Sequence, residues 1–246
     1  MWTLFHKFGS PPWLYQLSGS ILRWLLPLTL LALVVGATWG LLFTPPDFRQ
    51  GNSYRIIYIH VPAAVVALAG YYVMAIAGAI SLIWKMKMAD VALKACAPIG
   101  AALTFIALVT GSIWGKPTWG TWWVWDARIT SMLILLFLYL GVVALYEAYD
   151  NKAAAGKACA VLSLVGTVNI PIIYKSVDWW YSLHQPASIK FTGETTIDPS
   201  MLYPLLFMII TFYALFTCCL LLNMRAEILE REARTNWVRE IASESV

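Results

Sequence analysis

Residues 60–84 read HVPAAVVALAGYYVMAIAGAISLIW and contain no Asp, Glu, Lys or Arg. A helix needs about 20 mostly apolar residues to cross the hydrocarbon core of a bilayer, which is about 30 Å thick. The apolar residues form an unbroken run, whereas a membrane-spanning β-strand would alternate apolar with polar residues. This segment therefore predicts one transmembrane helix.

Five further stretches of the 246-residue chain have the same character. The composition agrees with this, because 60% of the residues are hydrophobic and only 12% are charged, which excludes a disordered chain and an ordinary soluble domain. We expect an all-α, polytopic membrane protein that forms a single domain over residues 1–246. The first span is too long for a signal-peptide core and should be retained. The six predicted transmembrane helices are residues 24–43, 60–84, 93–114, 129–147, 158–174 and 201–223.

The Lys and Arg residues are divided unequally between the two sides that these spans define. Eleven of the 17 lie on the side that holds both chain ends, and six lie on the other. Because cytoplasmic loops carry the excess of Lys and Arg, the N and C termini are both predicted to be cytoplasmic. The net charge of +4 then reflects topology, and no nucleic-acid partner is expected. The predicted outer loops are residues 44–59, 115–128 and 175–200.

Other features carry structural expectations only. The four cysteines form no CxxC or CxxCH motif, so we expect small core residues without disulfides. Pro171 and Pro204 allow kinks within their spans. The alternating Arg and Glu residues of segment 225–240 predict a solvated helical tail beyond the membrane.

Tryptophan is concentrated on the predicted outer side. Eight of the 13 Trp residues lie there, and five of these fall within residues 114–126. An aromatic belt at the membrane interface accounts for Trp39 and Trp84 and is an alternative for Trp114, but a belt is two-sided and one loop does not need five anchors. A large exposed aromatic surface indicates a partner, and a flat apolar ring suits it because an indole offers a broad face and an N–H group. The expected ligand platform consists of Trp114, Trp119, Trp122, Trp123 and Trp125.

Two of the three histidines fall on the same outer side. His60 lies at the outer end of the second span and His184 in the last outer loop, whereas His6 lies on the inner side and receives no role. Either one alone could be a hydrogen-bonded structural histidine. Two neutral imidazoles beside a Trp platform suit a planar iron macrocycle, with one axial ligand from each histidine. Zinc fits less well, because it usually takes three or four protein ligands.

The charged and polar residues of the outer side have candidate roles around such a ligand. Asp126 follows the Trp-rich run and needs a hydrogen-bond donor, which Arg128 or backbone N–H groups could supply. Haem propionates are carboxylates, so Arg55 and Arg128 are candidate counter-ions. For Arg49 and Lys116, a rim charge that reaches water is an equally good interpretation. Asp47, Gln50 and Arg55 are candidates for contact with a partner protein.

Residues 119–126 read WGTWWVWD, which resembles the WGxxWxWD signature of the tryptophan-rich WWD haem-handling proteins of cytochrome c biogenesis. The length, the six spans and the sequence around residues 55–62 and 111–131 resemble the cytochrome c maturation protein C family in particular. The resemblance covers essentially the whole chain, and every position of the signature is filled.

This resemblance implies a site and a set of partners. It assigns His60 and His184 as axial iron ligands, and the signature residues Trp119 to Trp125 as the platform that Asp126 closes. It implies non-covalent binding of haem b at the outer face of the bacterial inner membrane. It also implies delivery to a periplasmic haem chaperone, cytochrome c maturation protein E (CcmE). The further partners implied are the ATP-binding cassette subunits CcmA and CcmB, which would hydrolyse the ATP, and the small membrane protein CcmD. The chain itself would be a delivery subunit and not an enzyme.

Three other functions stay open on the residues alone. A membrane b-type electron-transfer cytochrome would be rapidly and reversibly reduced by quinol. A solute permease subunit with an aromatic vestibule would transport without iron, and His60→Ala would not change its colour. A structural subunit of a transporter complex would tolerate substitution of the Trp segment.

Overall fold

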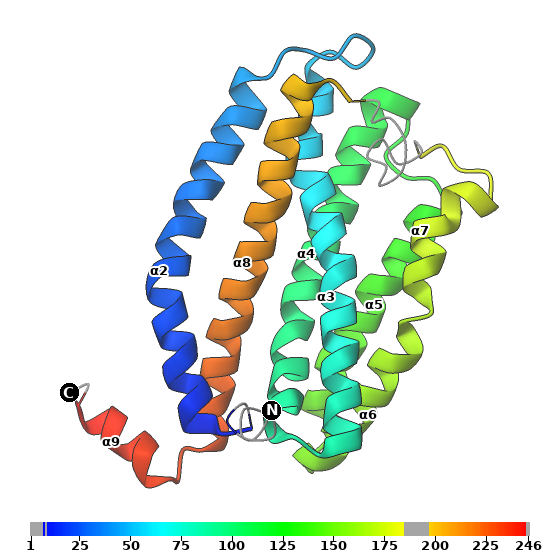
Figure 1. Cartoon of the computed structure of the whole chain (residues 1–246). Coiled ribbons are helices and arrows are strands. Elements are labelled where there is room, and N and C mark those ends of the chain that lie inside the picture. Colours follow the sequence, from blue (N-terminus) through cyan, green and yellow to red (C-terminus); the bar gives the residue numbers. More distant parts are fainter. Residues whose placement is uncertain (1–6, 8, 185–196, 245–246) are drawn as a thin grey trace.

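The computed structural model describes residue 7, residues 9–184 and residues 197–244, and within these ranges the chain folds as a helical bundle without β-strands (Figure 1). Six of its helical segments are long and apolar enough to cross a membrane, as the sequence predicts. The segments are Pro11–Phe43, Asn52–Trp84, Lys87–Trp119, Ala127–Ala148, Lys152–Trp179 and Pro199–Arg231. The chain is therefore a polytopic membrane protein.

The helices follow one another up and down the bundle, so that α2 begins and α8 ends at the same end, drawn lowest in Figure 1. A π-helical turn, η1, closes α2, and a short 3-10 helix, η2, precedes α3. The elements are α2 (Pro11–Thr38), η1 (Trp39–Phe43), η2 (Asn52–Ile56), α3 (Ile57–Trp84), α4 (Lys87–Trp119), α5 (Ala127–Ala148), α6 (Lys152–Gly166), α7 (Asn169–Trp179), α8 (Pro199–Arg231) and α9 (Asn236–Glu244).

Helix α3 is central and packs against α4, α6 and α8, whereas α2 packs mainly on α8 at one side of the bundle. Small residues of α3 lie at these contacts, since Ala63 and Ala67 are fully buried. Four buried tyrosines fill the interior between the helices, and their hydroxyl groups donate to backbone or carboxylate oxygens: Tyr58, Tyr71, Tyr139 and Tyr146. Each buried hydroxyl therefore has the hydrogen-bond partner that an apolar interior requires.

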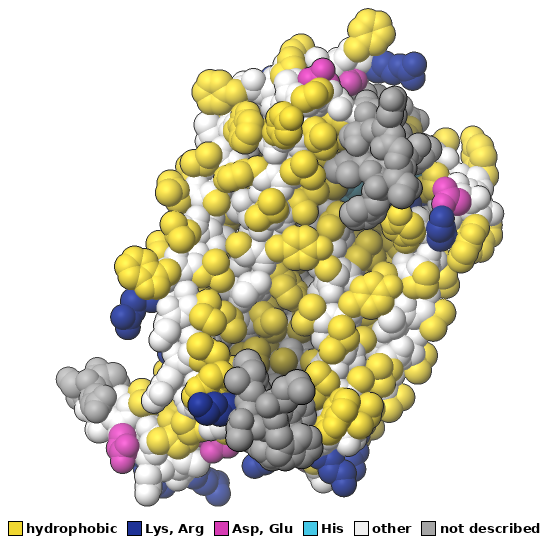
Figure 2. Space-filling view, viewed as in Figure 1, with side chains coloured by type: hydrophobic (Ala, Val, Ile, Leu, Met, Phe, Trp, Pro, Cys, Tyr) yellow, Lys and Arg dark blue, Asp and Glu magenta, His cyan; other side chains and the backbone are white. Residues whose placement is uncertain are grey.

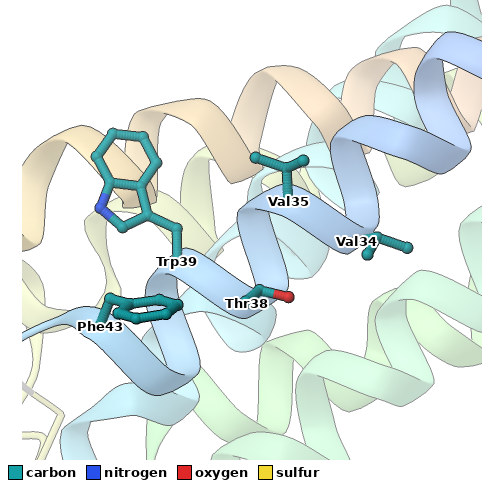
Figure 3. Close-up of a pocket in the computed structure, with 5 residues that line it drawn as sticks. All are labelled: Val34, Val35, Thr38, Trp39 and Phe43. Carbon is teal, nitrogen blue, oxygen red and sulfur yellow. The ribbon is translucent and has the colours of Figure 1, made fainter.

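The face of the bundle shown in Figure 2 is largely apolar along its length, and most of its charged side chains lie toward the two ends. This is the surface expected of helices that face lipid. An open apolar depression of about 310 Å³ lies on the exposed side of α2 and η1, between Val34 and Phe43 (Figure 3). Its lining is almost entirely apolar and includes neither of the predicted iron ligands, His60 and His184.

The helices extend beyond the predicted spans at both ends. Residues 115–119 and 175–179, predicted as loop, continue α4 and α7. Hydropathy marks the segment that matches the bilayer core, but backbone hydrogen bonding continues a helix into polar sequence until a residue stops it. For α4 that residue is Gly120, which adopts the left-handed conformation (φ 78°) that glycine accepts without strain.

The fifth span is not continuous. Helix α6 ends at Gly166 and α7 begins at Asn169, just before Pro171. A proline lacks an N–H group, and its ring clashes with the carbonyl of the residue four positions earlier, here Thr167. The predicted kink at Pro171 is therefore present, whereas Pro204 is accommodated within the continuous helix α8.

The start of segment 225–240 is helical up to Arg231, as predicted, but the prediction that it is solvated is wrong there. Glu227 is buried, and its carboxylate oxygens lie 2.6 Å from Lys94 Nζ and 2.6 Å from Arg231 Nε. Arg231 also contacts Asp90 Oδ2 at 2.6 Å, and Tyr146 donates to Asp90 Oδ1. The tail thus starts as an ion-pair cluster that joins α8 to α4 at the end of the bundle where α8 ends, which the distribution of Lys and Arg predicts to be the inner end. The helix then stops, and α9 begins at Asn236.

The cysteines behave as the sequence predicts. All four are free thiols; Cys96, Cys159 and Cys218 are buried and Cys219 is partly buried.

Candidate functional site

His60 lies in the first turns of α3, with its ring against α4. Its Nδ1 is 3.0 Å from the backbone carbonyl oxygen of Ala107 and 3.1 Å from Thr110 Oγ1. The Thr110 hydroxyl donates its own proton to the carbonyl of Ile106 at 2.6 Å, so toward His60 it offers a lone pair. Both neighbours of Nδ1 are then acceptors, which assigns the proton to Nδ1 and leaves the Nε2 lone pair available.

Residues at helical spacing on α4 form the surface that receives this ring. Ala107, Thr110, Gly111 and Trp114 recur at intervals of three and four and so share one face of the helix. A Cβ atom at Gly111 would lie 3.0 Å from His60 Cε1, so the missing side chain lets the imidazole approach the helix. Trp114 completes the contact, with its ring edge-on to the imidazole at a centroid distance of 5.8 Å.

His184 lies beyond the end of α7 and faces His60. The two ring centroids are 6.5 Å apart, and the ring planes are tilted by 35°. Trp119, the first residue of the WGTWWVWD segment, packs on His184 with a centroid distance of 6.2 Å. The two histidines and two of the predicted Trp residues therefore meet at one end of the bundle, although they come from three separate parts of the sequence.

The spacing of the two rings suits a shared metal ion. An imidazole nitrogen lies about 2 Å from a metal that it ligates, and its ring centre lies roughly 1 Å farther back, so two opposed ligands have centroids about 6 Å apart. The separation of His60 and His184 is close to this value. Within the described ranges, no group of three or more His, Cys, Asp or Glu side chains could hold a metal ion. The two imidazoles that the described residues bring together are those of His60 and His184.

The other Trp residues of the segment differ in exposure. The side chains of Trp122 and Trp125 are largely exposed, at 57% and 74%, while Trp123 packs edge-on to Trp125 at 5.4 Å. The carbonyl of Trp122 accepts a hydrogen bond from Ser112, which fixes the turn after α4. Trp123 Nε1 is buried and has no hydrogen-bond partner in the described structure.

Asp126 is buried and uses both carboxylate oxygens. Oδ1 accepts the backbone N–H of Ile129 at 2.8 Å, the usual arrangement of an aspartate at the N-cap of a helix, here α5. Oδ2 accepts the hydroxyl of Ser182. The donors to Asp126 are thus a backbone N–H group, as predicted, and Ser182 of the last outer loop, which was not predicted. Arg128 instead donates to Ser176 Oγ and to the carbonyl of Tyr174 on α7.

The first outer loop holds the three residues considered for partner contact. Asp47 Oδ1 accepts the backbone N–H groups of Arg49 and Gln50 at 2.9 and 2.7 Å, which closes the loop on itself. Arg55 donates to the carbonyl of Thr44 at 2.5 Å, and its Nε is buried without a partner in the part of the chain described. Each of these contacts holds the loop together.

Gln50 reaches the histidine site from this loop. Its Oε1 accepts the indole N–H of Trp114 at 2.6 Å, and Trp114 packs on His60. Sequence reasoning missed this contact, as it missed Thr110 and Ser182. Thr110 could have been found, because it lies four residues before Trp114 and therefore on the same face of α4. Nothing in the sequence pointed to Ser182.

Comparison with known proteins places the chain in a family. The family model described as heme exporter protein C matches residues 4–239. The heme exporter protein C of Escherichia coli (strain K12) is 52% identical over 241 residues, which cover 98% of this chain and 97% of the relative. The proteins of the same name from Bradyrhizobium diazoefficiens and Haemophilus influenzae are 49% and 46% identical, over 92% and 98% of this chain and 86% and 98% of the relatives. The chain belongs to the heme exporter protein C family.

Proposed function

We propose that this chain binds haem b non-covalently at the outer face of a bacterial inner membrane and delivers it for cytochrome c maturation. His60 and His184 are the axial ligands of the iron. The observation that carries the proposal is the 6.5 Å separation of the two imidazole rings, which leaves room for one iron between them. The name of the relatives, heme exporter protein C, supports the same ligand.

The two ligands differ in how firmly they are held. His60 lies on a transmembrane helix, and its Nδ1–H bonds to α4 present Nε2 to the iron. Partners of this kind orient a ligating histidine and increase its basicity. His184 lies on the non-helical segment after α7, so movement of that segment alone would open the coordination and allow the haem to leave.

The aromatic residues supply the surface for the ring. Trp114 and Trp119 contact the two imidazoles, while Trp122, Trp123 and Trp125 extend the platform toward solvent, where an exposed ring edge is accessible to a second protein. Arg128 and Arg55 are the proposed counter-ions of the propionates. A carboxylate ligand would also give the unpartnered N–H groups of Arg55 and Trp123 an acceptor.

The recipient in this proposal is the periplasmic chaperone CcmE, and the complex includes CcmA, CcmB and CcmD. Asp47 and Gln50 contribute by fixing the shape of the first outer loop. That loop presents Phe48, whose side chain is 99% exposed, to the outside. The chain performs no ATP hydrolysis in this scheme and acts as the haem-delivery subunit.

The test is the visible spectrum of the purified protein in detergent. The wild type should show a Soret band of six-coordinate, low-spin haem. His60→Ala and His184→Ala should each lower haem content by at least about tenfold, because even the outer partners of metal ligands contribute about 10–100-fold to affinity. Added imidazole should restore part of the lost haem.

His6→Ala is the matched control, since it removes the third histidine of the chain and should leave the spectrum unchanged. Unchanged haem content in the His60→Ala/His184→Ala double variant would refute the ligand assignment. Rapid, reversible reduction by quinol would instead favour an electron-transfer cytochrome.

A further inference from the structure

The segment that carries His184 continues from α7 without a helix of its own. Helix α7 ends at Trp179, and His184 follows five residues later. Ser182 connects this segment to the rest of the site. Its hydroxyl donates to Asp126 Oδ2 and accepts the backbone N–H of His184 at 3.0 Å. The backbone of His184 is thus linked through one serine to the last residue of the WGTWWVWD segment.

Asp126 is anchored on the opposite side. Its Oδ1 caps α5 through the N–H of Ile129, and α5 is a transmembrane helix packed against α4 and α7. The carboxylate is buried, at 9% exposure, so competition from water for its hydrogen bonds is limited. One carboxylate therefore joins a rigid helix to the segment that carries His184.

We propose that Asp126 is a positioning residue, which acts through Ser182 to hold His184 opposite His60. The proposal rests on the haem ligation put forward above. In this assignment the aspartate of the Trp-rich signature does not touch haem. Its two oxygens have separate functions, with Oδ1 starting α5 and Oδ2 fixing the second axial ligand. A hydrogen bond to a charged carboxylate is about twice as strong as a neutral one, which suits a contact that must hold an otherwise mobile ligand.

The two functions can be separated by substitution. Asparagine is as good an N-cap residue as aspartate, so Asp126→Asn keeps an oxygen for Ile129 N–H. Its amide NH₂ then takes the place of Oδ2, so the Ser182 hydroxyl loses its charged acceptor and can only accept a neutral hydrogen bond there, beside the one from His184 N–H. Ser182→Ala removes the contact from the other side, and Ser182→Thr preserves the hydroxyl.

Ser200→Ala is the matched control, since Ser200 also donates to an aspartate, Asp198, but does so at the exposed start of α8.

The experiment compares the visible spectra and the rate of haem loss to apo-myoglobin for the wild type and these four variants. Ser182→Ala and Asp126→Asn should retain haem on His60 but shift it from low-spin toward high-spin, and imidazole should restore the low-spin spectrum. Loss of one charge-assisted hydrogen bond predicts haem loss roughly tenfold faster than in the wild type. Ser182→Thr and Ser200→Ala should behave as the wild type.

Several outcomes would overturn the proposal. One is a wild-type spectrum and rate in both Ser182→Ala and Asp126→Asn. Another is a shifted spectrum that imidazole does not restore, which would indicate general damage to the fold; thermal unfolding of each variant checks this independently. Failure of the haem proposal itself would look different. The wild type would then lack the low-spin Soret band, or His184→Ala would keep its haem.

Discussion

At the scale of single residues, hydrogen bonding decides which atoms of the site are available. His60 is the clearest case. The carbonyl of Ala107 and the hydroxyl of Thr110 both accept from Nδ1–H, which leaves the lone pair of Nε2 available to ligate a metal. Trp114 is fixed in the same manner by Gln50. These contacts come from α4 and the first outer loop, so the chemistry of one histidine depends on two other parts of the chain.

Thr110→Val tests this dependence. The variant keeps the shape of the side chain but removes one of the two acceptors of His60 Nδ1–H, so we expect haem affinity to fall by about tenfold, the lower end for an outer partner of a metal ligand. Thr110→Ser should preserve affinity. The measurement is a haem titration followed by absorbance.

Thr104→Val is the control for Thr110→Val, because Thr104 also lies on α4 and, among the described residues, its hydroxyl bonds to its own helix at Gly100. Equal affinities for Thr110→Val and Thr104→Val would show that Thr110 does not orient His60.

At the scale of elements, close approach of helices fixes the frame around the site. Gly100 of α4 lies against the ring of Tyr139 on α5, and the hydroxyl of Tyr139 donates to the carbonyl of Ala67 on α3 at 2.7 Å. One glycine thus makes room for a tyrosine that joins three helices.

The break between α6 and α7 also shapes the frame around the site. It places Asn169 where its amide donates to the carbonyl of Ser131 on α5 at 2.9 Å.

Gly100→Ala should destabilise the bundle, although alanine is intrinsically the better helix former by about 1 kcal/mol. The new methyl group would overlap the Tyr139 ring, and overpacking of this kind typically costs about 1–3 kcal/mol. The expected result is a lower Tm in detergent. Gly141→Ala on α5 is the control, since its Cβ would meet only the flexible end of Leu162 at 3.3 Å, and its Tm should be unchanged or higher. Equal Tm values for the two variants would contradict the proposed packing.

At the scale of the whole molecule, the distribution of charge predicts the orientation, and the ion-pair cluster closes the end that is predicted to be inner. The excess of Lys and Arg lies at the end where α2 begins and α8 ends, and the histidine pair lies at the other. Asp90, Lys94, Glu227 and Arg231 join α4 to α8 near the inner end, away from the histidines. The molecule therefore has one end built for ion pairing and one built for an aromatic ligand.

This arrangement predicts the accessibility of introduced cysteines. Phe48→Cys should react with a membrane-impermeant maleimide in intact spheroplasts, because the positive-inside rule places the first outer loop outside. Lys87→Cys, exposed at the opposite end, should react only after the membrane is permeabilised. The wild type is the blank, since three of its four cysteines are buried and the fourth is partly buried. The reverse pattern of labelling would invert the predicted topology.

The sequence by itself determined the number and type of the spans, because hydropathy is a property of each local segment and does not depend on its neighbours. The WGTWWVWD segment also identified the family before any coordinates. The predicted helix ends were too short, since residues such as Lys116 and Lys175 are polar but remain helical. Polarity marks the limit of the membrane core, whereas caps and breakers such as Gly120 decide where helices end.

Only the tertiary structure decided which side chains meet. His60 and His184 could be proposed as a pair from their side of the membrane, but their 6.5 Å separation follows from how α3, α4 and α7 pack. The contacts of Ser182 with Asp126, of Gln50 with Trp114 and of Glu227 with Lys94 join segments far apart in the chain. Each depends on packing of the entire bundle, and no local pattern of residues encodes it. The physical reason is that transfer into lipid is governed by local composition, whereas a hydrogen bond requires two atoms brought within about 3 Å by the fold.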